Sequence, residues 1–212
     1  MTKTVVQCDF DGTVTYKDIS FLLLNAFAGP QWREYWEQYR DGKISVGRFN
    51  ELAFSMVKAT RHEMLDYIDG RFRVRAGFKD LVEFCRRKDY RFVVVSNGLD
   101  FYIGEILKTL GVAGTEHHAA EATFDPMGMR VRYVAADGVV VNRDFKDSYV
   151  SMFLAEGYWV AYIGNGTSDF APASRCQLVF ATDGLLEHCK KHDVSCVEFV
   201  TFSDIVKALE AW

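Results

Sequence analysis

The sequence has no apolar run long enough to cross a membrane and no block of basic residues. Its longest apolar stretch, residues 21–28, is interrupted by Asn25 and falls well short of the roughly 20 residues of a membrane-spanning helix. The first residues lack the charged start, apolar middle and cleavage site of a secretory signal, so we expect a cytoplasmic protein without a membrane partner. The formal net charge of −4, with no basic stripe, argues against nucleic acid as a partner.

Disulfides and zinc sites are not indicated either. The cysteines are odd in number, scattered and without a C-x-x-C spacing: Cys8, Cys85, Cys176, Cys189 and Cys196. This usage suits reduced thiols that pack as small apolar residues. With 49% apolar and 25% charged residues over 212 positions, the chain can bury one substantial core, or a core plus one small satellite domain.

Strands and helices alternate over most of the chain. Apolar runs and helical spacing predict strands over residues 5–8, 91–96, 159–163, 177–181 and 196–200, and helices over residues 78–87, 101–110, 148–155, 185–191 and 203–210. This order is typical of a parallel sheet with helices on both faces. Turn residues at 125–128 and 136–138 separate short strand-like runs and predict a small antiparallel excursion within residues 119–143.

Residues 19–75 follow a different pattern: their apolar and aromatic residues recur at helical spacing, and the alternation of apolar and polar residues that marks a strand is almost absent. Thr60 and Glu63 have the spacing of a capping box that opens the last helix of this segment. We therefore expect an α/β fold with a Rossmann-like parallel core domain, residues 1–15 and 76–212, and a small helical cap domain, residues 16–75.

The first strand ends in Asp9-x-Asp11-Gly12. On an extended backbone these two carboxylates would point to the same side about 6 to 7 Å apart, close enough to share a phosphate or a metal ion. The alternative is an Asx-type turn that only caps the strand. Three later segments favour the first interpretation.

Ligands of such sheets bind at the carboxyl ends of the strands. Ser96-Asn97-Gly98 follows the second strand, Gly164-Asn165 to Asp169 follows a later one, and Lys146 stands at the start of a helix between them. Taken singly, Ser96 could be a helix cap, Lys146 a solvated surface residue, and Asn165 and Asp169 turn residues. Their order and their shared position at strand ends indicate a common site.

These four segments resemble the four motifs of the haloacid dehalogenase superfamily, and the helical insert falls where that superfamily has its type-1 caps. Within it, the chain resembles the phosphoserine phosphatase-like branch and most of all the 2-hydroxy-3-keto-5-methylthiopentenyl-1-phosphate phosphatases of methionine salvage. The closer resemblance depends on segments that are less specific than the four motifs: Asp18-Ile19, residues 41–45, residues 180–187 and residues 202–204. The resemblance spans nearly the whole chain.

The resemblance implies a Mg²⁺-dependent phosphatase that acts through an aspartyl-phosphate. Asp9 would be the nucleophile, Asp11 the general acid and base, and Lys146 a fixed positive charge. The expected roles of the other residues are binding of the substrate by Ser96, Asn97, Gly98 and Asp18, and binding of the metal by Asp9, Asp11, Asn165 and Asp169. The partner would be a small phosphorylated metabolite, and the sequence does not indicate the oligomeric state.

Asn165 departs from the family pattern, which has an aspartate ligand at this position. An amide oxygen can coordinate Mg²⁺ but removes one negative charge, worth on the order of 4 kcal/mol at close range before desolvation and screening. Three interpretations remain open: weak ligation compensated by Asp169, drift to a metal-poor or non-catalytic binding protein, or an engineered or deamidated position.

The sequence indicates the substrate less clearly than it indicates the reaction. Asp18 could lie near the substrate or could cap the following helix. Phe21, Trp32 and Trp36 could line a pocket for an apolar tail. The methionine-salvage intermediate is the first candidate and phosphoserine the second, with a non-catalytic relative as a different class. His117 and His118 are adjacent near the expected end of a strand and should face opposite ways, which disfavours a paired metal site.

Overall fold

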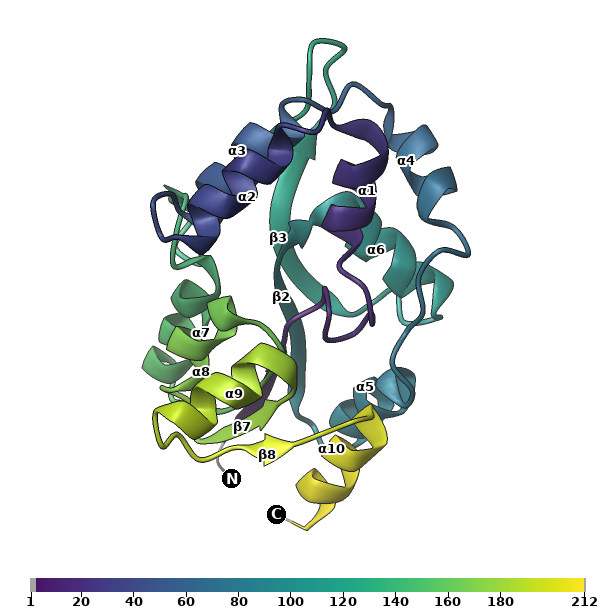
Figure 1. The fold of residues 1–212 in the computed structure, drawn as a ribbon. Helices are drawn as coiled ribbons and strands as arrows, with labels where there is room; N and C mark the ends of the chain where they lie inside the picture. The colour runs from purple at the N-terminus through teal and green to yellow at the C-terminus, as the bar shows by residue number, and fades with distance from the viewer. Residues whose placement is uncertain (1–2, 212) are drawn as a thin grey trace.

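Four short apolar runs form the parallel centre of the structure, a computed structural model that describes residues 3–211 (Figure 1). The sheet has eight strands in the order β5-β4-β3-β2-β1-β6-β7-β8 among the described residues. The strands are β1 Thr4–Cys8, β2 Arg91–Leu99, β3 Glu116–Thr123, β4 Arg130–Val134, β5 Val140–Val141, β6 Trp159–Gly164, β7 Leu178–Ala181 and β8 Val197–Glu198. β1 pairs with β2 and β6 on its two edges, and its side chains Val5, Val6 and Cys8 have no exposed surface because both faces of the sheet are covered.

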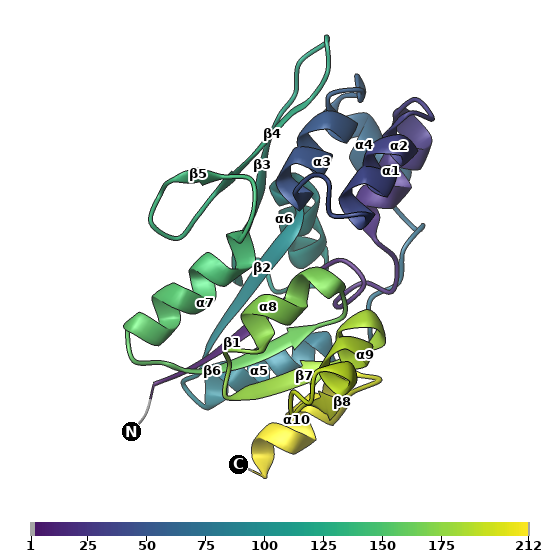
Figure 2. The same cartoon turned by 60° about the vertical axis from the view of Figure 1, so that its left-hand side comes forward.

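Helices cover both faces of this sheet and one of its ends. They are α1 Ile19–Phe27, α2 Trp32–Arg40, α3 Val46–Phe54, α4 Arg61–Ile68, α5 Phe78–Arg87, α6 Asp100–Thr109, α7 Phe145–Ala155, the 3₁₀ turn η1 Thr167–Asp169, α8 Phe170–Ala173, α9 Asp183–Lys191 and α10 Phe202–Glu210. α5 and α10 pack together on one face, and α7, α8 and α9 lie on the other (Figures 1 and 2). Within residues 3–211, none of the helices combines the length and apolar composition that crossing a bilayer requires.

The helices α1 to α4 form a separate layer beyond the carboxyl ends of the strands (Figure 1). Local sequence signals start three of them: Asp18 caps α1, Ser45 caps α3, and the predicted capping box of Thr60 and Glu63 is present at α4. The segments that lead into and out of this layer pair at Thr15 and Val74. The division into a core domain and a cap domain at residues 15/16 and 75/76 stays a prediction.

One close backbone contact holds the helical layer against the core. The Gly47 N–H, in the first turn of α3, donates to the Asn142 carbonyl at 3.0 Å. A Cβ at position 47 would lie 2.6 Å from that carbonyl oxygen, so only glycine permits this approach. α3 also packs on β4, which places the strand pair β3–β4 beside the helical layer (Figure 2).

The predicted fold class is confirmed: a mostly parallel sheet, a helical cap and an antiparallel excursion. The antiparallel pairing of β3 with β4 involves residues 121–123 and so lies within the predicted range, whereas the first residues of the same strand, from Glu116, pair parallel with β2. His117 and His118 therefore lie near the start of a strand, and their expected place near its end was wrong. The predicted helix over residues 148–155 begins at Phe145, which puts Lys146 in its first turn.

Candidate active site

Three neighbouring strands bring the predicted site residues to one edge of the sheet. Cys8, the last residue of β1, is opposite Val94 of β2 and Ile163 of β6. Asp9 therefore follows directly after β1. Ser96 on the β2 side and Asn165 on the β6 side lie close to the same level of the sheet. The parallel register alone is enough to gather these three side chains.

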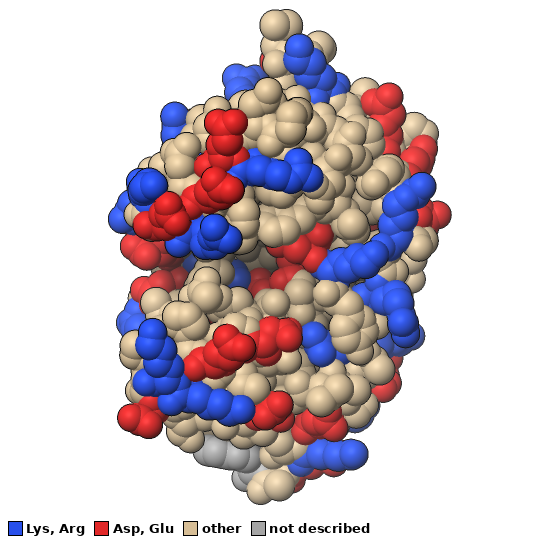
Figure 3. All heavy atoms as spheres, in the orientation of Figure 1, with Lys and Arg blue, Asp and Glu red and all other residues tan. Residues whose placement is uncertain are grey.

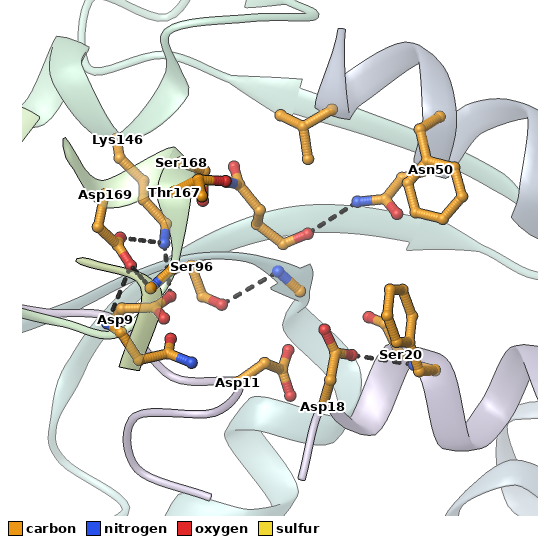
Figure 4. Close-up of a pocket in the computed structure, with 18 of the residues that line it drawn as sticks. Asp9, Asp11, Asp18, Ser20, Asn50, Ser96, Lys146, Thr167, Ser168 and Asp169 are labelled. Carbon is orange, nitrogen blue, oxygen red and sulfur yellow. Dashed lines mark hydrogen bonds and ion pairs between the residues drawn. The ribbon is translucent and has the colours of Figure 1, made fainter. Parts of the chain in front are cut away.

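Asp9 and Asp169 share one buried lysine. Lys146 Nζ lies 2.6 Å from Asp9 Oδ1 and 2.6 Å from Asp169 Oδ1 (Figure 4). The exposed fractions are 3% for Lys146, 4% for Asp9 and 0% for Asp169. Burial opposes the charge of the lysine, but the two carboxylates outweigh it and raise the pKa of Lys146. Burial and the nearby Asp169 charge raise the pKa of Asp9 to about 6, although Lys146 opposes the shift.

Asp169 has partners on both of its oxygens. Oδ1 accepts from Lys146 and from the Tyr162 hydroxyl at 2.7 Å, and Oδ2 accepts from the N–H groups of Gly166 at 2.9 Å and Asn165 at 3.2 Å. A carboxylate with four donors has little free capacity for a further ligand. In this structure it orients the lysine and the turn that carries Asn165.

Asn165 faces the loop that follows Asp11. The Thr13 hydroxyl lies 3.0 Å from both Asn165 Oδ1 and Asp9 Oδ2. One hydroxyl proton cannot satisfy both oxygens at once, so one of them keeps a lone pair for another ligand. A Cβ at Gly12 would lie 2.2 Å from Asn165 Nδ2, so this approach requires glycine.

Two oxygen atoms suited to Mg²⁺ lie around the Thr13 hydroxyl: one from the Asp9 carboxylate and one from the Asn165 amide. Within residues 3–211, no three His, Cys, Asp or Glu side chains gather as a ready metal site. A carboxylate and an amide oxygen are still donors that Mg²⁺ accepts, with main-chain carbonyls and waters as further ligands. The single carboxylate of this set implies a weaker site than one with two.

Asp11 is buried and held at both oxygens. The backbone N–H of Ile19 donates to Oδ1 at 2.9 Å, and the Tyr102 hydroxyl makes a short hydrogen bond to Oδ2. Burial, followed by the nearby Asp18 charge, raises the pKa of Asp11 well above its ordinary value. A raised pKa favours the protonated form of the carboxyl group, which is the form that a general acid needs.

Ser96, Asn97 and Gly98 differ in what they offer. Ser96 Oγ accepts from the Gly98 N–H at 3.0 Å, so its own proton can point toward a ligand. The Asn97 carbonyl is already occupied, since it accepts from Asn50 Nδ2 of α3 at 2.9 Å and from the Tyr133 hydroxyl of β4 at 2.6 Å. Gly98 leaves room for the Asp11 carboxylate, because a Cβ there would lie 2.3 Å from Asp11 Oδ2.

Asp18 caps a helix and also lines the cavity, while its predicted contact with the substrate stays a prediction. Its Oδ1 accepts from the Phe21 N–H at 2.9 Å as the cap of α1. The residue also lines the same cavity as Asp11. Burial raises the pKa of Asp18 to about 6.

These residues surround a cavity of about 350 Å³ between the sheet edge and the helical layer. Acidic side chains are visible in the hollow where the upper and lower halves meet (Figure 3). The lining residues are Asp9, Asp11, Asp18, Ser20, Phe21, Trp36, Tyr39, Val46, Phe49, Asn50, Ser96, Asn97, Gly98, Lys146, Asn165, Gly166, Thr167, Ser168, Asp169, Asp183 and Gly184. Every residue predicted for catalysis, substrate or metal is thus at one cavity.

Among the aromatic residues considered for an apolar pocket, Phe21 and Trp36 line the cavity and Trp32 does not. Trp32 is buried behind Phe21, with ring centroids 5.4 Å apart. The histidines have separate partners: His117 Nδ1 lies 3.2 Å from the Thr115 carbonyl, and His118 Nε2 lies 3.0 Å from Glu116.

Four side chains at the site were missed by sequence reasoning: Tyr102, Tyr162, Asn50 and Tyr133. Each comes from the interior of a helix or strand, where a tyrosine or asparagine carries no local signal of function. Only the glycine at position 98 hinted that another group approaches the backbone closely.

The haloacid dehalogenase-like hydrolase family model matches residues 6–174. The chain is 30% identical to a 2-hydroxy-3-keto-5-methylthiopentenyl-1-phosphate phosphatase of Geobacillus kaustophilus, covering 99% of this chain and 97% of the relative. It is 26% identical to a protein of the same name from Brevibacillus brevis, covering 98% and 96%. A solved phospho-aspartyl intermediate analogue of phosphoserine phosphatase has a TM-score of 0.71 at 18% identity, covering 98% and 99% of the two chains. At this identity the likeness shows the fold alone.

Proposed function

The chain belongs to the haloacid dehalogenase-like hydrolase family and is a phosphoric monoester hydrolase, and from this premise we propose that it hydrolyses a small phosphorylated metabolite through an aspartyl-phosphate on Asp9. The observation that carries the proposal is the buried Asp9 carboxylate, held by Lys146 at 2.6 Å and Thr13 at 3.0 Å, with a protonatable Asp11 beside the same cavity.

Asp9 would act as the nucleophile in the first step. One of its carboxylate oxygens forms a bond to phosphorus while the bond from phosphorus to the leaving oxygen breaks. Lys146 fixes the orientation of the carboxylate, and the Ser96 hydroxyl can donate to a phosphate oxygen. Pre-positioned donors of this kind stabilise charge without reorganising during the reaction.

Asp11 would move the protons. It gives its proton to the leaving alkoxide in the first step and takes one from the attacking water in the second. In that second step the water oxygen bonds to phosphorus and the bond from phosphorus to Asp9 breaks, which releases inorganic phosphate. The hydrogen bonds from Tyr102 and Ile19 keep the carboxyl group at the wall of the cavity throughout.

Mg²⁺ is the proposed cofactor, and Asp9, Asn165 and the backbone carbonyl of Asp11 would hold it. When bound, the ion would supply the positive charge that neutralises the phosphate oxygens. We place Asp169 outside this set as a positioning residue, since four donors already occupy its carboxylate.

For the substrate we propose 2-hydroxy-3-keto-5-methylthiopentenyl-1-phosphate, the compound in the names of relatives that the chain matches over nearly its full length. Its apolar thioether tail suits the aromatic residues Phe21 and Trp36 at the cavity. Phosphoserine is the comparison substrate, because phosphoserine phosphatases share the fold.

The first test measures hydrolysis of p-nitrophenyl phosphate with and without Mg²⁺. We expect Asp9→Asn to lower kcat by at least about 1,000-fold, and acid-quenched wild-type enzyme to carry a phosphoryl group that the variant lacks. Asp137→Asn is the matched control, because Asp137 lies in the exposed turn before β5 and should keep wild-type activity. Undiminished activity of Asp9→Asn would overturn the assignment.

A further inference from the structure

The side of the cavity away from Asp9 is formed by the helical layer. α1 contributes Phe21, α2 contributes Trp36 and Tyr39, and α3 contributes Phe49 and Asn50. The aromatic rings support one another: Phe21 meets Trp36 edge-on with centroids 4.7 Å apart, and Tyr39 stacks on Phe49 at 5.9 Å. We call the wall formed by these five residues the leaving-group subsite, because a phosphate at Asp9 directs the rest of its ester toward it.

The charges around the cavity exclude a second anionic group on the substrate. Among the described residues that line it, five are aspartates and Lys146 is the only cation. That lysine is already paired with Asp9 and Asp169 at 2.6 Å. A carboxylate on the leaving group would enter a partly buried, acidic space without a counterion, which is unfavourable.

Asn50 presents a single hydrogen-bonding atom to the cavity. Its exposed fraction is 4%, and both N–H bonds of its amide are used: one donates to the Asn97 carbonyl (Figure 4). The other donates to the Tyr133 hydroxyl. The Asn97 main-chain carbonyl can only accept a hydrogen bond. The end of the Asn50 amide that faces it must therefore be the NH₂ group. Tyr133 itself donates to the same carbonyl at 2.6 Å and locks the arrangement.

The remaining atom, Asn50 Oδ1, can only accept a hydrogen bond. No group of residues 3–211 donates to it, although the residue lines the cavity. The atom is not among the buried polar atoms that lack a partner, so it is open to the cavity and to solvent there. A ligand that displaces this solvent has to bring a hydroxyl donor to the same point, because a desolvated acceptor without a partner is costly.

We propose that Asn50 is a specificity-determining residue that accepts a hydrogen bond from an uncharged hydroxyl on the leaving group, while the aromatic wall holds an apolar remainder. This inference rests on the phosphatase activity proposed above and deepens it. Tyr133 is the positioning residue, because it acts on the substrate only by fixing the Asn50 amide. The substrate class is a phosphomonoester with a hydroxyl group, an apolar tail and no second negative charge.

The test compares kcat/KM for four synthetic or simple esters: 2-hydroxyhexyl phosphate, hexyl phosphate, glycerol 1-phosphate and O-phosphoserine. For the wild-type enzyme we expect 2-hydroxyhexyl phosphate to exceed both hexyl phosphate and phosphoserine by about 10- to 100-fold. Glycerol 1-phosphate should fall between them, because it has the hydroxyl but no tail.

The variant Asn50→Leu, similar in size and without the acceptor, should reduce the ratio of 2-hydroxyhexyl to hexyl phosphate to about one. Tyr133→Phe should lower the same ratio mainly through KM, because it loosens the Asn50 amide without touching the reacting atoms. Asn142→Leu is the matched control: Asn142 is exposed and does not line the cavity, so the ratio should stay at its wild-type value.

The outcomes separate this inference from the activity on which it rests. If no ester, p-nitrophenyl phosphate included, releases phosphate, the proposed function fails and the inference with it. If all four esters react at similar rates, or if phosphoserine is preferred, the inference alone is overturned. The comparison of esters on the wild-type enzyme decides this even where Asn50→Leu does not fold.

Discussion

Lys146→Met is expected to destabilise the protein more than most single substitutions. The ammonium lies 2.6 Å from two carboxylates, and all three side chains are at least 94% buried. Methionine keeps most of the side-chain volume but removes the charge, so two buried carboxylates then face each other unpaired. Removal of one partner from a buried ion pair costs about 3 to 5 kcal/mol in the free energy of unfolding.

The structure also shows which of the two carboxylates loses more stabilisation when the lysine is removed. Without the lysine, Asp169 keeps the Tyr162 hydroxyl and two backbone N–H groups. Asp9 keeps the Phe10 N–H and, as its one side-chain donor among the described residues, the Thr13 hydroxyl. Asp9→Asn should therefore restore part of the stability in the Lys146→Met background, with a coupling of about 1 to 3 kcal/mol. Asp169→Asn should restore less.

The loss should also depend on pH in a defined direction. Burial already raises the pKa of Asp9 to about 6 in the presence of the lysine, and without the lysine it rises further. A carboxyl group whose pKa is raised in the folded state favours folding at low pH and loses that contribution as pH rises through the folded pKa. The deficit of Lys146→Met should therefore be larger at pH 8 than at pH 5.

The assay is urea unfolding followed by tryptophan fluorescence, in the presence of a chelator, at pH 5 and pH 8. Lys43→Met is the matched control, because Lys43 pairs with Asp41 at the exposed surface and should change stability by less than about 0.5 kcal/mol. A Lys146→Met protein within that same margin of wild type at pH 8, or no recovery in the double variant with Asp9→Asn, would refute the reasoning.

Three further predictions concern the proposed metal ligand Asn165, the carboxyl group of Glu116, and the space that Gly98 leaves for Asp11. Asn165→Asp should add a negative charge to the proposed ligand set and lower the Mg²⁺ concentration for half-maximal activity by about 10-fold, with a matching gain in calorimetric affinity; an unmoved midpoint contradicts the ligand assignment. The hydrogen bond from His118 lowers the pKa of Glu116 to about 2. The ionised Glu116 carboxylate therefore contributes to the free energy of unfolding above pH 4.5, and this contribution is lost as the pH falls toward 2. Glu116→Gln should therefore cost about 1 kcal/mol at pH 7, after allowance for its partial exposure, and little at pH 2; equal losses at both would refute this. Gly98→Ala places a methyl group 2.3 Å from Asp11 Oδ2 and should lower kcat/KM about 100-fold with an unchanged circular dichroism spectrum; wild-type activity would contradict the fit.

The places of the predicted reacting residues follow from the sequence because the topology constrains them. The apolar runs before Asp9, Ser96 and Asn165 are buried strands, and their alternation with helices predicts that they are parallel. The structure then shows that β1 lies between β2 and β6. Once the strands are parallel, whatever follows them meets at one edge. No knowledge of side-chain packing is needed for that step.

The partners of those residues depend on packing and do not follow from the sequence. The hydrogen bond between Tyr102 and Asp11 joins residues 91 positions apart, and that between Asn50 and Tyr133 spans 83. Helical or strand periodicity tells which face a residue occupies but not which distant atom it meets. The same limit applies to Trp32 and Trp36, which share a helix although only Trp36 reaches the cavity.

The extent of β3 beyond His118 did not follow from sequence patterns for another reason. Its residues 116–123 include three alanines and two histidines and lack the β-branched alternation that marks a strand. The segment is extended because β2 offers an open parallel edge on one side and β4 an antiparallel one on the other. Tertiary pairing thus outweighs weak local preference, as expected for strands.

A single electrostatic cause links the proposed cofactor to the proposed choice of substrate. Five aspartates and one lysine line the cavity, and the lysine is already paired with two of them. A phosphate dianion approaches Asp9 more favourably if a further cation offsets this excess, and burial, which raises the pKa of Asp11, disfavours the negative charge of that carboxyl group. The proposed cation beside Asp9 would serve the phosphate, so a second anionic group at the aromatic wall would meet the same acidic surroundings without relief. The proposed divalent ion and the proposed exclusion of a negatively charged leaving group are therefore two consequences of one charge distribution.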